Sequence, residues 1–157
     1  MSTSPSPTAT TSAPAKPLSP FEHDAPVKAA RGWASALGRA VNAHDTSMQS
    51  LRHWVTDHGR TMSQQEVASD LQHHYTWPGP QPFTPVHVAV DGDAATIAAC
   101  ALGRGWSQDK SGAPVVHKRT IWPVEIRLMK AGGSWKVDAL YSSQADCGGV
   151  RVPGVKW

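Results

Sequence analysis

The chain has 157 residues, of which 39% are hydrophobic and 17% are charged, a composition that fits one modest globular domain rather than two. Fifteen Lys and Arg residues against 12 Asp and Glu residues give a formal net charge of +3, and the only adjacent basic pair is Lys118 and Arg119. This scattered, nearly balanced charge argues against nucleic-acid binding. No apolar run approaches the roughly 18 residues needed to cross a bilayer.

Residues 1–20 are rich in Ser, Thr and Pro, and Leu18 is their only aliphatic side chain larger than Ala. Such a segment cannot bury enough apolar surface to offset its ordering entropy. We therefore expect a disordered spacer over 1–20 and a single domain over 21–157, with a C-terminal tail after about residue 143. The spacer is typical of an exported protein tethered to the cell envelope through an anchor that has been removed, and the alternative is an ordinary cytoplasmic tail.

The first element has helical periodicity. Between Asp24 and His44, apolar residues recur every three or four positions, which predicts an amphipathic helix. Asp24 can cap its start, and Pro26 fits the first turn, where its missing N–H is not needed.

Two capping-box spacings follow. The pair Thr46 and Gln49 predicts the start of a short second helix, and the pair Ser63 and Glu66 predicts a third helix over about 64–76. The sequence Trp-Pro-Gly-Pro directly after it ends the helical region.

The apolar period then changes to two. Two alternating stretches flank a turn at Asp91-Gly92 and predict a hairpin in which Val88 pairs with Ala95. A further strand is predicted over about 116–129, interrupted by Pro123, and a last one over about 135–141. The inner face of these two strands is expected to carry Trp122, Trp135 and Tyr141. The order of elements predicts an α+β domain, with three N-terminal helices packed on one face of an antiparallel sheet of about four or more strands.

The two cysteines, Cys100 and Cys147, lie in a predicted strand and in the tail after the last strand. A disulfide between them would hold the tail to the sheet and contribute roughly 4 kcal/mol in the chain-entropy model. The alternative is two free thiols in a reducing compartment. Neither has a CxxC partner, which argues against zinc or redox chemistry.

Catalytic motifs are absent from the sequence: there is no G-x-S-x-G, P-loop or G-x-G-x-x-G. The residues able to act as a proton shuttle or to stabilise an enolate are His73, His74, Tyr75, His87 and Tyr141. Strand and helix-end positions explain these histidines without catalysis, and capping, turns and outward strand positions explain the carboxylates, Glu66 included. We expect no metal and no cofactor, because histidines close in sequence do not share a helix face.

Seven tryptophans are the most unusual feature of the composition. Four of them, Trp33, Trp54, Trp122 and Trp135, fall on stripes predicted to be buried. Trp77, Trp106 and Trp157 fall in loops or at the terminus, where they either mark a contact surface or close the open end of the domain. The residues expected to line a pocket or contact surface are Trp33, Tyr75, Trp77, His87, Trp106, Trp122, Trp135 and Tyr141.

Three short motifs resemble the nuclear transport factor 2-like superfamily, also called the SnoaL-like or cystatin-like α+β cone. Residues 41–45, VNAHD, are similar to its V-N-A-x-D; residues 90–97, VDGDAATI, to its V-x-G-D-x-A-x-V hairpin; and residues 133–137, GSWKV, to its G-x-W-K-V strand. The likeness spans about 25–145 and implies a strongly bent, cone-like sheet.

More narrowly, the chain resembles uncharacterised exported bacterial proteins and lipoproteins of this superfamily, in which a cysteine after the hairpin is matched by one beyond the last strand. This implies the pair Cys100–Cys147 and an extracytoplasmic location. The fold hosts enzymes and binding domains alike. We expect a non-enzymatic envelope binding or assembly domain, for example an accessory of a conjugation or secretion system, with a protein partner or small apolar ligand. The alternatives are a SnoaL-like isomerase, cyclase or dehydratase for function and a homodimer for assembly.

Overall fold

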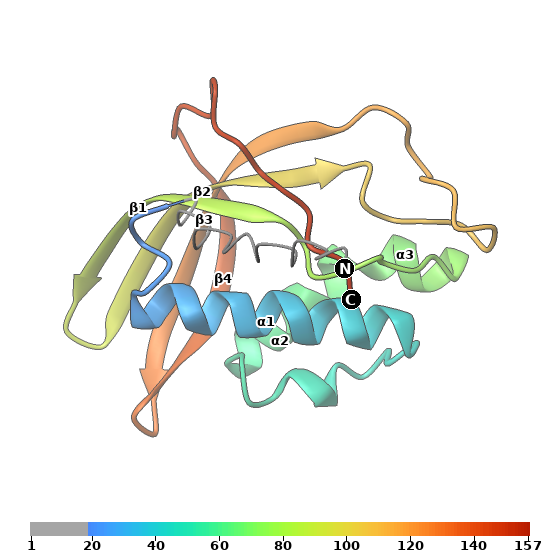
Figure 1. Cartoon of the computed structure of the whole chain (residues 1–157). Helices are drawn as coiled ribbons and strands as arrows, with labels where there is room; N and C mark the ends of the chain where they lie inside the picture. Colours follow the sequence, from blue (N-terminus) through green and yellow to red (C-terminus); the bar gives the residue numbers. More distant parts are fainter. Residues whose placement is uncertain (1–18) are drawn as a thin grey trace, which may run out of the picture.

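The computed structural model describes residues 19–157, in which helices precede a four-stranded antiparallel sheet (Figure 1). The elements are α1 (Ala25–Asn42), η1 (Gln49–Leu51), α2 (Asp57–Glu66), α3 (Ala68–His73), β1 (Phe83–Asp91), β2 (Ala94–Arg104), β3 (Thr120–Ala131) and β4 (Ser134–Ser142). The predicted α+β fold, with helices packed on one face of the sheet, is confirmed. No helix of the described residues is both long enough and apolar enough to span a membrane.

The N-terminal boundary of the described residues lies against the sheet. Ser19 is buried, and its hydroxyl donates a hydrogen bond to the carbonyl of Pro85 at 2.8 Å. The predicted spacer included Ser19 and Pro20, but Ser19 packs against the sheet. The rest of the predicted spacer, residues 1–18, lies outside the described residues.

Helix α1 forms as its periodicity predicts. Pro26 occupies the first turn, and Asp24 is the N-cap residue by position, although its carboxylate makes no capping hydrogen bond. One face of the helix is buried against the sheet through Val27, Ala30, Trp33, Ala34, Leu37 and Val41. This face forms the centre of the hydrophobic core.

The helix predicted from Thr46 does not form; the segment contains only the three-residue 3-10 helix η1. Local hydrogen bonds compete with a capping box here, because the Asp45 carboxylate accepts from the hydroxyls of Ser47 and Ser50, each at 2.6 Å. These hydrogen bonds lower the pKa of Asp45 below its ordinary value of 3.8, and the bond from Ser47 has the largest effect. Met48 also has a left-handed backbone, with φ +53°.

Helix α2 begins at Asp57, earlier than the start near residue 64 that was predicted for the third helix. The Thr56 side chain caps it by accepting from the Gly59 amide at 3.0 Å. Gly59 lets α2 approach β4 closely, since an ideal Cβ there would lie 2.1 Å from the Val137 carbonyl oxygen. The third predicted helix is divided at Val67 into α2 and α3.

Ser63 is not a capping residue but lies inside α2. Its hydroxyl donates to the Gly59 carbonyl at 2.7 Å and accepts from the Trp33 indole at 3.0 Å. The capping role expected for Glu66 is therefore also wrong, because Glu66 is the last residue of this helix.

The β1–β2 hairpin forms, but its turn is one residue later than predicted. Asp91 pairs with Ala94, so Val88 faces Ile97 rather than Ala95. Gly92 takes the positive φ of +57° that this tight turn needs.

A β-bulge between Arg127 and Leu128 shifts the register of β3 against β4. A bulge adds one residue to one strand, so every later side chain of β4 changes face. Leu140 consequently faces Ile126 on the inner side, and Tyr141 lies opposite Glu125 on the outer side. The expectation that Tyr141 points inward is wrong for this reason; its ring is 46% exposed. Strand β3 also begins at Thr120 rather than near 116.

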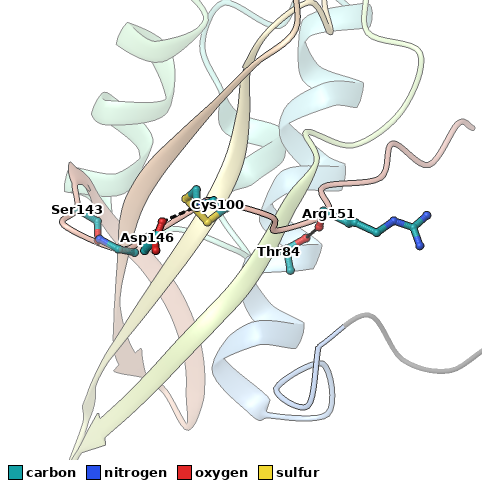
Figure 2. The surroundings of a disulfide bond; sticks show 8 residues. Thr84, Cys100, Ser143, Asp146 and Arg151 are labelled. Atoms are coloured by element: carbon teal, nitrogen blue, oxygen red, sulfur yellow. Dashed lines mark hydrogen bonds between the residues drawn. A yellow bond between two sulfur atoms is a disulfide. The ribbon is translucent and has the colours of Figure 1, made fainter.

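The C-terminal tail crosses the outer face of the sheet from β4 toward β1, and a disulfide holds it there (Figure 2). The predicted Cys100–Cys147 bond is confirmed, with a Cα–Cα distance of 5.7 Å. Beyond it, the Thr84 hydroxyl donates to the Arg151 carbonyl at 2.6 Å. The terminal Trp157 then packs beside α1, with its indole donating to the Trp77 carbonyl at 3.0 Å.

Candidate functional site

A cavity of about 410 Å³ opens on the inner face of the sheet, between α1 and strands β2–β4. Its apolar walls are formed by Trp33, Phe83, Ala101, Trp122, Ile126 and Leu140. Its volume is in the range of sites that hold small organic ligands.

The floor of the cavity is buried and apolar. Trp33 is 3% exposed, and its indole N–H is occupied by Ser63, so the ring offers only carbon surface to the cavity. Phe83 and Ile126 are also buried beside it, at 4% and 1% exposure. A ligand here would meet aromatic and aliphatic surface with no unsatisfied donor beneath it.

Trp122 forms the outer wall. It lies opposite Ala101 on the inner face, yet its side chain is 51% exposed, so the predicted burial is wrong. Trp122 lines the open cavity, so its side chain meets solvent instead of core side chains. The indole rests on Gly103, where an ideal Cβ would lie 2.1 Å from Trp122 Cδ1. A large, solvent-reachable ring at the mouth of a cavity can close over a ligand.

The polar rim contains Glu66 and Arg104, from the end of α2 and the end of β2, together with Gln81. Both charged residues are exposed, and within residues 19–157 neither forms an ion pair. Sequence reasoning missed Glu66, because the capping-box spacing with Ser63 offered a structural explanation that the fold does not use.

A second cavity of about 290 Å³ adjoins the first, and Glu66, Gln81, Gly103 and Arg104 line both. Three of the predicted contact residues, Tyr75, Trp77 and Trp106, line it.

Trp77 and Trp106 fill this end of the domain, at 6% and 7% exposure. The Trp77 indole donates to the Asp70 carboxylate at 2.6 Å, and that of Trp106 donates to the Gly79 carbonyl at 3.0 Å. These two loop tryptophans are therefore buried and hydrogen-bonded at this end of the domain, and both also line the second cavity.

The remaining predicted site residues lie apart. Tyr141 reaches the rim of the first cavity, but the Arg127 guanidinium covers its ring at 4.5 Å on the outer side. His87 is exposed on β1 and makes an edge contact with Phe21, and Trp135 is half-buried near the β3–β4 turn. Neither residue lines the cavity. Between residues 19 and 157, no group of three or more His, Cys, Asp or Glu residues is placed to hold a metal ion.

No protein-family model matches the chain, and no curated protein matches it either. Among solved structures, it is similar to a function-unknown protein from Mycobacterium tuberculosis, with 15% identity, coverage of 76% of this chain and 72% of that one, and a TM-score of 0.45. It is also similar to a putative calcium/calmodulin-dependent protein kinase II association domain from Xanthomonas campestris. That match has 15% identity and a TM-score of 0.42, and it covers 74% of this chain and 84% of the other.

Proposed function

We propose that this chain is a non-enzymatic binding domain of the bacterial cell envelope that holds a small apolar ligand in the cavity between α1 and the sheet. The observation that carries the proposal is the cavity itself: about 410 Å³, with the buried Trp33 and Phe83 as its floor and the exposed Trp122 at its mouth. Burial of aromatic and aliphatic ligand surface against these rings supplies the affinity.

An extracytoplasmic location is part of the proposal, with the Ser-, Thr- and Pro-rich residues 1–20 as a spacer. The Cys100–Cys147 disulfide supports it, since such bonds persist mainly in oxidising compartments. A role as an accessory of a conjugation or secretion assembly would add a protein partner, which the apolar cavity could receive as an inserted side chain.

The cavity can be tested by filling it. Ala101 lies on its wall, on the inner face of β2, whereas Ala98 pairs with Glu125 on the outer face of the same strand. We expect the wild type to bind the uncharged fluorescent probe N-phenyl-1-naphthylamine with a saturable signal, Ala101→Phe to lose it, and Ala98→Phe to retain it. Equal binding by wild type and Ala101→Phe, with both folded by circular dichroism, would contradict the proposal.

Glu66 favours a second candidate, an isomerase, cyclase or dehydratase of the SnoaL-like kind. Its carboxylate lies at the rim of an apolar cavity, where it could abstract a proton from a bound substrate. Its exposure to water instead suits recognition of a polar group on the ligand. Glu66→Gln separates the two, because an enzyme would lose turnover of any identified substrate while binding it, and a binding domain would show only an altered affinity.

A further inference from the structure

A second site lies at the opposite end of the sheet from Trp122, next to the β3–β4 turn. A cleft of about 440 Å³ there is lined by η1, the start of α2 and the first residues of β4. Three of its lining residues are cationic: Arg52, Arg60 and Lys136. We call the cleft that they line the cation cleft, and these three residues its cations.

The cations of this cleft lack acidic partners. Within the described part of the chain, ion pairs join Arg31 to Glu22 and Arg127 to Glu125, and His58 lies 3.7 Å from Asp138; none of these contacts includes Arg52, Arg60 or Lys136. Asp57 is the single carboxylate among the lining residues. Three positive charges around one cleft repel one another. An anion bound between them would reduce this repulsion.

Two of the cations are also held in place. Lys136 is half-buried, and its ammonium donates to the Arg52 carbonyl at 2.9 Å. Arg60 is half-buried, and its guanidinium donates to the Ser47 carbonyl at 3.4 Å. Each group keeps further N–H donors free, since an ammonium has three and a guanidinium five. Their positions come from separate elements of the fold, so the cleft is formed before an anion arrives.

From these observations we infer that the cation cleft binds a phosphoryl group carried by a larger molecule. A phosphoryl group offers several charged acceptor oxygens to donors that converge from different sides, and both Arg and Lys bind it through charge-assisted hydrogen bonds. The cleft is larger than one phosphate ion, which leaves room for the molecule that carries it. A lipid headgroup and a soluble phosphoester share this chemistry.

The test uses the oxidised full chain and two probes. In the first arm, inorganic phosphate is titrated against ¹⁵N-labelled protein at constant ionic strength, with chloride as the reference anion. In the second arm, sedimentation with phosphatidylglycerol vesicles is compared with sedimentation with phosphatidylcholine vesicles. Arg60→Gln/Lys136→Gln removes two cations of the cleft, and Lys110→Gln/Arg151→Gln removes the same charges from residues that do not line it.

We expect saturable shifts of the Arg52, Arg60 and Lys136 amides with phosphate, and an affinity at least about tenfold weaker in the cleft variant but unchanged in the control variant. Vesicle binding that depends on the same two residues would identify a lipid headgroup, and phosphate binding alone would identify a soluble phosphoester. No saturable response in either arm, or an equal loss in the control variant, would overturn the inference. The filled-cavity variant Ala101→Phe should bind phosphate normally, so this result is independent of the proposed apolar ligand.

Discussion

Removal of the Cys100–Cys147 disulfide should lower the stability of the domain mainly through its unfolded state. The bond joins residues 47 positions apart. In the chain-entropy model, a closed loop of this size contributes about 4 kcal/mol to the free energy of unfolding. For a domain of this length, we expect the loss to lower Tm by roughly 10–15 °C.

The native tail has other attachments that should keep it in place after reduction. Thr84 still donates to the Arg151 carbonyl, and Trp157 still donates to the Trp77 carbonyl. We therefore expect the folded state to change little, while the unfolded chain expands and exposes more surface. The denaturant m-value should rise as the stability falls.

Urea unfolding of three samples tests this reasoning: the oxidised wild type, the reduced wild type and Cys100→Ser/Cys147→Ser. The reduced wild type and the double variant should agree, and reductant should leave the double variant unchanged. A difference between oxidised and reduced protein below about 1 kcal/mol, well outside the range for such a loop, would refute the chain-entropy argument.

Three further predictions concern local packing and charge. Gly59→Ala should destabilise the domain by about 3 kcal/mol in urea, because the added Cβ meets the Val137 carbonyl and backbone must move; a change within about 0.5 kcal/mol would contradict this close approach. Trp157→Ala should cost about 1–2 kcal/mol, because the half-exposed ring loses its packing and its bond to the Trp77 carbonyl, and an unchanged Tm would show that the tail end is not held. The lowered pKa of Asp45 means that its carboxylate stabilises the fold above the ordinary carboxyl pKa and loses this effect as pH falls through the lowered value. Asp45→Asn should therefore be less stable than wild type at pH 7, with a difference that shrinks below about pH 4; a constant difference from pH 7 to pH 2 would exclude this cause.

Patterns that depend on long stretches of sequence predicted the fold well. The apolar stripe from Val27 to Val41 predicted a buried helix face, and α1 has that face. The alternating residues on either side of Gly92 predicted a hairpin, which β1 and β2 form. Short local signals were less reliable. The pair Ser63 and Glu66 has the spacing of a capping box, but Ser63 instead accepts the indole N–H of Trp33, a partner 30 residues away that no local pattern shows.

The site was harder to predict because small backbone irregularities determine it. One bulge turns Tyr141 from the inner to the outer face, so Leu140 takes the inner position and Tyr141 reaches only the rim of the cavity. Trp122 fits a buried stripe, yet it lines an open cavity and is half exposed. Periodicity gives the face of a strand but does not show whether a residue on that face is packed or lines a cavity.

The proposed ligand site is the cavity between Trp33 and Trp122, and a crystal structure of the oxidised chain with bound N-phenyl-1-naphthylamine would test it most directly. We predict density for the aromatic rings of the probe within the cavity, against Trp33 and Phe83, with the Trp122 indole closed over them. A cavity that stays empty, or is filled by Trp122 itself while the probe lies on the outer face of the sheet, would contradict it.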